Sequence, residues 1–312
     1  MLRLIEELTE ERRLAREPLQ VGSLFGRYTI LGEIVRGNST IVYWAGDHEQ
    51  VGPMALKTPH PELADDDQCR RRFKLEGMIG SMFDHPNIVP VYEFGEIDQV
   101  PYIVMEAVDG ITMADLLQND GPISPVEAAR LVLEIAGAIG QVHDQGVLIL
   151  DLKPQNILLQ RTKLDDSGGQ EWRPLLIDFG LAILAVEEEE DPDGRAMAGT
   201  PSYMAPEQIL IGPAGCGPFT DLYAIGVILF ELLIGRPPHR GVNRFETIRA
   251  VIVEDPVALR DLHPAIPAEL EAICLKCLSK ATDGRYMKAQ ELISDLEQFL
   301  EGVSSSPRNL TR

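Results

Sequence analysis

Two short segments carry the side chains with the clearest chemistry. DLKPQN contains Asp151, Lys153 and Asn156, and IDFG, further along the chain, contains Asp178. Phosphoryl transfer needs a carboxylate beside the attacking hydroxyl, a fixed cation and oxygen ligands for a metal ion. Asp151 is suited to accept the hydroxyl proton, and Lys153 to stabilise the moving phosphoryl group. Asn156 and Asp178 offer the hard oxygen ligands that Mg²⁺ prefers. The pattern therefore predicts a phosphoryl-transfer site.

The order of these motifs also carries information. With the strand-like NILL between them, they resemble the eukaryotic-like protein kinase family, and the bacterial serine/threonine protein kinase branch in particular. The resemblance runs from about Arg27 to Leu300. It implies an α+β, bilobed protein kinase fold, with a small β-rich N-lobe containing one main helix and a larger, mainly helical C-lobe. It also implies ATP and Mg²⁺, or Mn²⁺, as cofactors and proteins bearing Ser or Thr as substrates.

An upstream lysine and glutamate match two further family positions. Lys57 in MALK corresponds to the family's strand lysine, and Glu76 lies on the following helix, at the place of its partner. The resemblance implies that Lys57 holds the α and β phosphates while Glu76 fixes the ammonium group. Taken without the other motifs, a strand Lys and a helix Glu form such pairs on many protein surfaces.

The segment YIVMEAVDG, at 102–110, resembles the hinge between lobes. Its backbone at Glu106 and Val108 is expected to hydrogen-bond adenine beneath Met105, with apolar side chains as walls. The residues that the resemblance assigns to nucleotide binding are Ile34, Gly37, Val42, Ala55, Lys57, Met105, Glu106, Val108 and Leu158.

GTPSYMAPEQ, at 199–208, resembles the end of an activation segment, which positions the substrate peptide in this family. Thr200 is expected to hydrogen-bond Asp151 and Lys153, a pattern of Ser/Thr rather than Tyr specificity. Further structural roles are expected for Glu207, paired with Arg285, and for Asp221, which would anchor the catalytic loop.

Two motifs depart from the family. In the glycine-rich loop, Val35 and Thr40 stand at the first and third glycine positions, which leaves Gly37. The added Cβ atoms should stiffen this loop. In the catalytic loop, ILD replaces HRD, so that Leu150 stands where the family has an arginine that grips a phosphorylated activation loop. Residues 182–198 also contain no Ser, Thr or Tyr. We therefore expect activity without activation-loop phosphorylation, in a kinase that is constitutively ordered or controlled through its N-terminus or a partner.

The remaining elements follow from hydrophobic periodicity. Strands are expected at 27–35, 39–47, 54–58, 87–97 and 101–108, with one helix at 67–83, and a mainly helical region after Gly110 containing the strand pair NILLQR and RPLLID. The predicted divisions are an N-terminal helical extension (1–26), a kinase domain (27–302, with lobes at about 27–106 and 107–302) and a disordered tail or linker (303–312). A homodimer or a regulatory partner bound through the N-terminal helix stays open.

Composition and hydropathy argue against several other functions and locations. The chain has 28 Lys and Arg against 49 Asp and Glu, a net charge of −21 at pH 7, which disfavours nucleic acid. Its most apolar stretch, AIGVILFELLIG, contains Glu231 and is shorter than the about 20 residues of a bilayer span, so no membrane insertion is expected. The N-terminus lacks the pattern of a secretory signal, and we expect a cytoplasmic protein if the chain is complete. Cys274 and Cys277 are interpreted as packing residues.

Two other functions stay open at this stage. A pseudokinase, acting as a nucleotide-binding or scaffolding protein, would share the fold. A small-molecule phosphotransferase of similar fold would share the lysine, base and metal residues, but it would have no use for the substrate platform of GTPSYMAPEQ.

Overall fold

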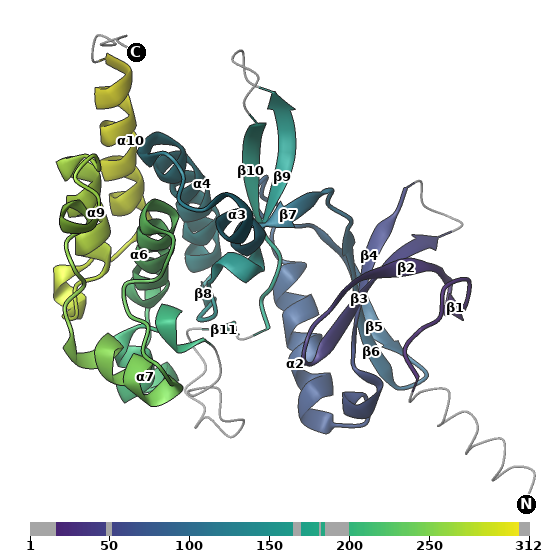
Figure 1. The fold of residues 1–312 in the computed structure, drawn as a ribbon. Coiled ribbons are helices and arrows are strands. Elements are labelled where there is room, and N and C mark those ends of the chain that lie inside the picture. The colour runs from purple at the N-terminus through teal and green to yellow at the C-terminus, as the bar shows by residue number, and fades with distance from the viewer. Residues whose placement is uncertain (1–16, 48–51, 165–169, 181, 185–199, 306–312) are drawn as a thin grey trace, which may run out of the picture. The chain divides into compact units, whose positions relative to one another are not determined.

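The computed structural model describes residues 17–47, 52–164, 170–180, 182–184 and 200–305. These residues form two compact units (Figure 1). Unit 1 takes in Met1–His85, Val89–Asp109 and Asp178–Gly180, and unit 2 takes in Pro86–Ile88, Gly110–Ile177 and Leu181–Arg312. Residues 1–16 of the predicted N-terminal extension, 306–312 of the predicted tail and most of the segment 181–199 lie outside the described residues.

Unit 1 is built on a six-stranded antiparallel sheet in the order β1-β2-β3-β4-β6-β5. Alternating burial in TIVYWAGD shows why this segment is a strand, because every second side chain enters the core. The predicted strands of this region are confirmed, and the two-residue β1 is an addition. The strands are β1 (Leu24–Phe25), β2 (Tyr28–Arg36), β3 (Thr40–Asp47), β4 (Met54–Pro59), β5 (Val91–Ile97) and β6 (Val100–Glu106).

One face of this sheet carries a closed apolar core. Its members are Phe25, Tyr28, Ile30, Ile41, Tyr43, Ala45, Met54, Leu56, Tyr102 and Val104. The predicted helix is α2 (Asp67–Gly80), which begins where the Asp66 side chain accepts from the backbone of Gln68. An added Cβ at Gly77 would lie 2.5 Å from Phe94, so glycine lets α2 pack closely on β5. This packing fixes α2 on the sheet.

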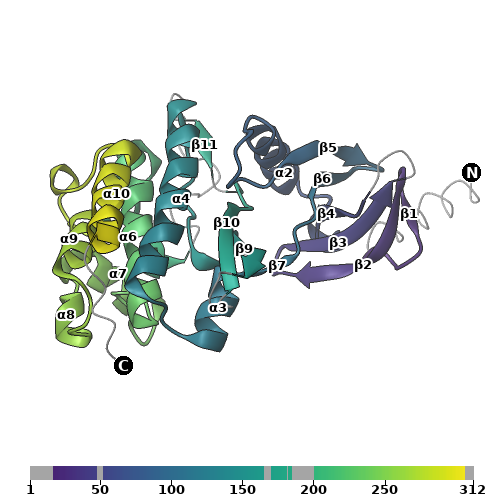
Figure 2. The same cartoon turned by 90° about the horizontal axis from the view of Figure 1, so that it is seen from above.

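Unit 2 is mainly helical, as Figures 1 and 2 show. The helix α4 begins with a Ser124 cap and with Pro125 in its first turn. Helix α6 is buried almost all round and contacts both α4 and α9, which makes it the centre of this unit. Cys274 and Cys277 are buried in the α6–α9 contact. The helices are α3 (Met113–Asp120), α4 (Pro125–Asp144), α5 (Pro206–Leu210), α6 (Pro218–Ile234), α7 (Arg244–Val253), α8 (Leu259–Leu262), α9 (Ala268–Cys277) and α10 (Ala289–Ser305).

Strands of two small sheets of unit 2 precede and follow the DLKPQN segment in the chain. The predicted strand pair is confirmed as β9 (Ile157–Leu164) and β10 (Gln170–Leu176), with β7 (Gly110–Thr112) added beside β9. A second pair joins β8 (Val147–Leu148) to β11 (Ile183–Leu184). DLKPQN therefore lies between β8 and β9, two strands of different sheets. Among the described residues, no helix is both long and apolar enough to span a bilayer.

Candidate active site

In unit 1 a buried lysine lies between two carboxylates. Lys57 Nζ is 2.5 Å from Glu76 Oε1 and 3.5 Å from Asp178 Oδ1. Strand β4 carries the lysine and helix α2 carries Glu76, and these two residues are only 7% and 8% exposed. The Asp178 side chain is 31% exposed. The predicted ion pair of Lys57 with Glu76 is therefore present, and Asp178 brings the cluster to the surface.

Burial and charge act in opposite directions on this cluster. Burial lowers the pKa of Lys57, but the charges of Asp178 and Glu76 outweigh it and raise this pKa above its usual value. Burial raises the pKa of Glu76 to about 7, against the opposing effect of Lys57. The lysine therefore stays protonated at neutral pH. It provides a fixed positive charge that can bind an anionic group.

The DFG segment is held in unit 1 by its phenylalanine. Phe179 stacks on Phe83 with ring centroids 5.6 Å apart and planes inclined by 24°. The N–H of Gly180 donates to Asp178 Oδ1 at 2.8 Å. An added Cβ at Gly180 would lie 3.0 Å from that oxygen, tighter than most such contacts. The carboxylate of Asp178 is thus placed by an aromatic anchor and by a backbone that approaches it closely.

Strand register puts four of the nine predicted nucleotide-binding residues on one sheet face. Lys57 lies opposite Val42 on β3, and Ala55 lies opposite Met105 on β6. Cross-strand partners share a face, and so do residues two apart on a strand, so these four side chains point the same way. Their face is opposite to that of the closed core, where Leu56 points.

The strand register does not assign the other predicted nucleotide-binding residues to this face. Ile34 lies at a register shift of β2, between Glu33 and Val35, where it has no cross-strand partner. The N–H of Glu106 donates to Pro90 O at 2.9 Å. Val108 in unit 1 and Leu158 on β9 of unit 2 are both half-buried.

The altered glycine-rich loop forms a tight turn. Strands β2 and β3 pair as far as Arg36 and Ile41, and the N–H of Gly37 donates to Thr40 O at 2.9 Å. His60, a residue that the sequence analysis did not single out, lies with Nε2 2.8 Å from Gly37 O. The Gly37 amide is thus engaged within the turn.

In unit 2 the predicted catalytic side chains are in contact with one another. Lys153 Nζ donates to Asp151 Oδ2 at 2.5 Å, and Asn156 Nδ2 donates to Asp151 O at 2.9 Å and to Oδ2 at 3.3 Å. The 3₁₀ turn Pro154–Asn156 brings Asn156 back toward Asp151. The three residues therefore form one cluster around a carboxylate.

The backbone before Asp151 is strained and tightly held. Leu150 has φ of 60°, a region that residues with a side chain seldom adopt. The N–H groups of Ile149 and Leu150 donate to the buried Asp221 carboxylate at 2.9 and 2.8 Å, which confirms the predicted anchor. Gln208 Nε2 donates to Leu150 O at 2.9 Å. The surrounding structure therefore imposes this conformation, as strained sites require.

Two supports of this loop were missed from the sequence. His143 Nε2 lies 2.8 Å from Asp221 Oδ2, and Gln208 holds Leu150. Gln208 follows Glu207 directly in GTPSYMAPEQ, which is a signal that could have identified it. His143 lies on α4, whose amphipathic pattern does not predict the contact of this residue with Asp221.

The expected hydrogen bonds of Thr200 are not present among the described residues. Its carbonyl accepts from the N–H of Tyr203, and its side chain is exposed without capping the following turn. The Asp151 carboxylate accepts hydrogen bonds from Lys153 and Asn156. The role of Thr200 stays a prediction.

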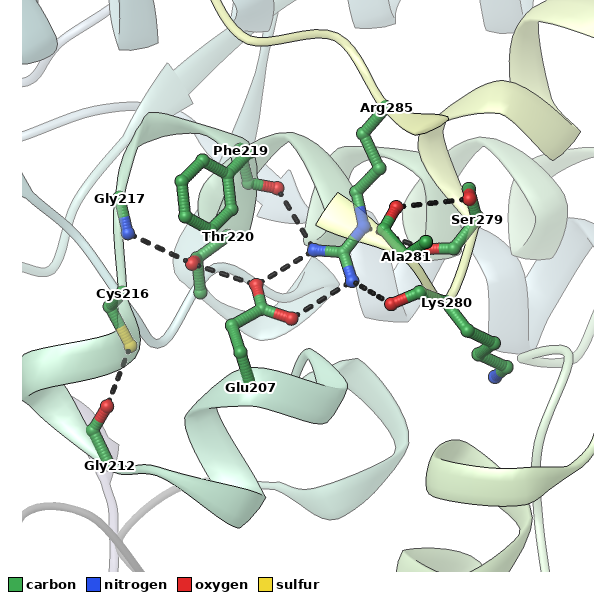
Figure 3. A network of polar contacts seen from close by, with 10 residues as sticks. All are labelled: Glu207, Gly212, Cys216, Gly217, Phe219, Thr220, Ser279, Lys280, Ala281 and Arg285. Carbon is green, nitrogen blue, oxygen red and sulfur yellow. Dashed lines mark hydrogen bonds and ion pairs between the residues drawn. The ribbon is translucent and has the colours of Figure 1, made fainter. Parts of the chain in front are cut away.

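The predicted pair of Glu207 with Arg285 is confirmed, and Figure 3 shows its surroundings. Two Arg285 nitrogens donate to the two Glu207 oxygens at 2.7 and 2.9 Å, and Thr220 Oγ1 donates to Glu207 at 2.9 Å. Arg285 also donates to backbone carbonyls of Phe219, Ser279 and Lys280. This network joins the segment after GTPSYMAP to the start of α6 and the turn before α10.

The predicted metal ligands are compatible with a hard cation. Because the Asn156 nitrogen faces Asp151, its side-chain oxygen is the atom left to accept, and it has no hydrogen bond to a described residue. Within the described ranges, no cluster of three or more His, Cys, Asp or Glu could hold a metal by itself. Mg²⁺ commonly uses one or two protein oxygens together with substrate phosphates, which suits a sparse ligand set.

Comparisons with known proteins agree with this geometry. Residues 28–296 match the family described as protein kinase domain. The chain is 35% identical over 287 residues to the serine/threonine-protein kinase PrkC of Bacillus subtilis, covering 92% of this chain and 42% of that protein. It is 33% identical over 288 residues to the serine/threonine-protein kinase PknB of Mycolicibacterium smegmatis, covering 90% of this chain and 44% of that protein. It therefore spans less than half the length of these curated relatives.

Solved structures show the same fold. The crystal structure of the Mycobacterium tuberculosis PknI kinase domain matches with a TM-score of 0.68 and 26% identity, covering 90% of this chain and 99% of that one. The predicted α+β kinase fold, with its β-rich N-lobe and helical C-lobe, is thereby confirmed. The chain belongs to the protein kinase family.

Proposed function

We propose that this chain is a serine/threonine protein kinase that transfers the γ-phosphoryl group of Mg·ATP to a Ser or Thr hydroxyl of another protein. The observation that carries the proposal is the buried Lys57, held between Glu76 and Asp178. A charge of this kind is costly to bury, and one whose hydrogen bonds are incompletely satisfied by the protein marks a candidate anion-binding site.

In unit 1, Lys57 holds the α and β phosphates and Glu76 fixes its position. The pair reaches 2.5 Å, so the lysine is oriented before nucleotide binds. The face with Val42, Ala55 and Met105 receives the adenine ring, with Ile34, Gly37 and Leu158 as further contacts. Backbone groups of Glu106 and Val108 hydrogen-bond the ring edge.

In unit 2, Asp151 accepts the proton of the substrate hydroxyl. Lys153, 2.5 Å from that carboxylate, stabilises the transferring group, and Thr200 positions the acceptor. Asn156 and Asp178 are the proposed ligands of Mg²⁺ or Mn²⁺. When bound there, the metal ion would neutralise charge on the phosphate oxygens.

The catalytic loop supports independence from activation-loop phosphorylation. Leu150 stands where a phosphate-gripping arginine would be, and its backbone is already held by Asp221 and Gln208. The loop therefore has an ordered support without a phosphate. Mass spectrometry after incubation with Mg·ATP tests this, because activity that appears only after a residue in 181–200 is phosphorylated would contradict it.

The domain limits and setting belong to the same proposal. We assign 27–302 to the kinase domain, 1–26 to a helical extension and 303–312 to a tail or linker. A homodimer or regulatory partner would act through the extension. The cytoplasm, where ATP is available, is the proposed location.

A phosphotransfer assay tests the proposal. Wild type should label a generic protein substrate from γ-labelled ATP, and Asp151→Asn should abolish labelling because the base is lost. Asp144→Asn, an exposed carboxylate at the end of α4, is the matched control and should leave labelling unchanged.

A pseudokinase is the second candidate, and the engaged Gly37 amide favours it. It predicts that wild type transfers no more phosphate than Asp151→Asn in the same assay. Binding of ATP without transfer, under both Mg²⁺ and Mn²⁺, would then replace the enzyme proposal.

A further inference from the structure

A cavity of about 420 Å³ lies in unit 2 beside α7 and the loop 235–243. Its volume falls within the range of about 300–1,000 Å³ typical of pockets for small ligands. The ionisable side chains that line it are Arg236, His239, Arg240, Glu246, Arg249 and Glu254. None of these residues belongs to the site proposed for phosphoryl transfer.

The two acidic residues of the cavity are already engaged. Glu254 Oε1 pairs with Arg249 at 2.7 Å. Glu246 accepts from the N–H of Val242 at 3.0 Å and from Asn243 Nδ2 at 3.4 Å. Glu246 lies in the first turn of α7 and Glu254 directly after its last residue, and neither carboxylate pairs with Arg236 or Arg240 among the described residues.

Two guanidinium groups of the cavity have no such partner. Arg236 and Arg240 make no hydrogen bond or ion pair with any described residue, and both are exposed. Arg240 acts on the nearby Glu231 only at longer range, and Glu231 holds the hydroxyl of Tyr203 at 2.6 Å. In a chain of net charge −21, two unpaired arginines on one cavity are a local positive field.

A buried histidine adds a third donor. His239 is 4% exposed, and its Nε2 lies 2.9 Å from Lys280 Nζ. An ammonium group can only donate, so Nε2 accepts and Nδ1 carries the ring proton. Nδ1 has no partner among the described residues, and it is not one of the unpartnered polar atoms sealed from solvent. His239 lines the cavity, and we take this N–H as the third donor to a ligand there.

The geometry points to this cavity as a binding site for a phosphorylated side chain of a protein partner. A phosphoryl group carries a charge of about −2 and three acceptor oxygens, which matches two guanidinium groups and one imidazole N–H. Arginine suits this ligand because its planar fork donates two parallel hydrogen bonds to phosphate. A carboxylate, with two oxygens and one charge, would leave one donor unmatched.

Apolar side chains beside the cavity favour a peptide over a free ion. Val242 is 92% exposed and Phe245 is 81% exposed, and they lie between the lining residues Gly241 and Glu246. Exposed apolar groups next to a charged pocket are typical of a protein contact surface. A phosphorylated segment with apolar neighbours would cover both residues.

Fluorescence anisotropy on the whole chain, without ATP, tests the assignment. The probes are a labelled peptide with one phosphoserine between Leu and Phe, its unphosphorylated form and a Glu-substituted form. We expect the phosphopeptide to bind at least about tenfold more tightly than the other two, as charge-assisted hydrogen bonds imply. The double variant Arg236→Gln/Arg240→Gln should remove most of that difference. Arg260→Gln, an exposed arginine of unit 2 outside the cavity, should retain it.

Three results would overturn the assignment. They are equal binding of the three peptides, an equal loss in Arg260→Gln, and tighter binding of anionic lipid vesicles than of the phosphopeptide through the same two arginines. Thermal unfolding of each variant verifies that the exposed substitutions leave the fold intact. Because no nucleotide is present, a failure here leaves the phosphotransfer proposal standing, and the converse also holds.

Discussion

Two buried pairs of a glutamate with a cation occur among the described residues, and they differ in how completely the cation is satisfied. Arg285 in unit 2 is 3% exposed, and it donates to both Glu207 oxygens and to three backbone carbonyls. Lys57 in unit 1 is 7% exposed, and its ion-pair contacts are Glu76 at 2.5 Å and Asp178 at 3.5 Å, the second beyond ordinary hydrogen-bond length. Its Nζ also lies 5.9 Å from the centroid of the Phe73 ring.

This difference separates structure from function. Burying a charge is unfavourable unless hydrogen bonds replace its water, and the Arg285 network does so completely. The Arg285 network connects three chain segments (Figure 3). Lys57 has one contact at hydrogen-bond length, to Glu76, and a longer one to the partly exposed Asp178. A buried cation that is incompletely satisfied indicates a bound anion, and a satisfied one indicates a scaffold.

The largest expected effect is a loss of stability when the fully hydrogen-bonded Arg285–Glu207 pair is broken. Arg285→Met leaves the Glu207 carboxylate buried without its partner, which should lower the free energy of unfolding by about 3–5 kcal/mol. Urea denaturation measures it, with the exposed Arg260→Met as control. The double variant Arg285→Met/Glu207→Leu should recover part of this loss. A loss below about 1 kcal/mol, the value typical of surface pairs, would remove the structural role.

Breaking the Lys57–Glu76 pair should affect activity strongly and stability little, the opposite of the Arg285–Glu207 pair. Lys57→Met should lower the phosphotransfer rate by about 10²–10³-fold, as loss of one preorganised charge does. The unfolding free energy should change little, because burial raises the pKa of Glu76 and lets it become neutral. Lys288→Met, on an exposed lysine, is the control for rate. Strong unfolding with unchanged activity in the folded fraction would reverse the distinction between the pairs.

The anchor of the catalytic loop should show an intermediate effect on both properties. In Asp221→Asn the amide group cannot accept at both positions, so one of the N–H groups of Ile149 and Leu150 loses its acceptor. We expect about 1–3 kcal/mol lower stability, together with slower phosphotransfer. Hydrogen exchange at these two amides would locate the effect. Unchanged protection of both would show that Asp221 does not hold the loop.

The smallest effect concerns pH. Burial, aided by the Lys280 charge, lowers the pKa of His239 to about 4. Since an unfolded histidine titrates near about 6.5, the unfolded chain binds an additional proton between these values. Stability should therefore fall as pH decreases through this window, by no more than about 2 kcal/mol after allowance for solvent screening.

His239→Gln should remove this slope, because an uncharged amide can still accept from Lys280 and does not titrate. Thermal unfolding between pH 4 and pH 7 is the measurement. His263→Gln, at an exposed position, should keep the wild-type slope. An unchanged slope in His239→Gln would assign the acid sensitivity to other groups.

The sequence was sufficient for elements with a long periodic pattern. The main strands of unit 1, helix α2 and the β9–β10 pair follow from alternation and apolar spacing. The strands β1, β7, β8 and β11 have two or three residues, too few for a period to be visible. Their pairing comes from tertiary contacts.

Some features of the candidate site could likewise be predicted from sequence motifs, and others could not. Motifs identified Lys57, Glu76 and Asp178, and the structure supplied their distances. The positive φ of Leu150 could not be predicted, because leucine avoids this region and only the contacts of Asp221 and Gln208 impose it. The Gly37 turn also depends on a distant residue, His60, whose position no local pattern gives.

The most direct test of the open Lys57 cluster is the shift of thermal unfolding caused by Mg·ATP. A ligand at 100 times its dissociation constant stabilises the folded state by about 2.7 kcal/mol, so the wild-type midpoint should rise by several degrees. Lys57→Met should lose this shift, while Arg285→Lys, with a lower starting midpoint, should keep it. An equal shift in Lys57→Met and wild type, or none in wild type, would contradict the account.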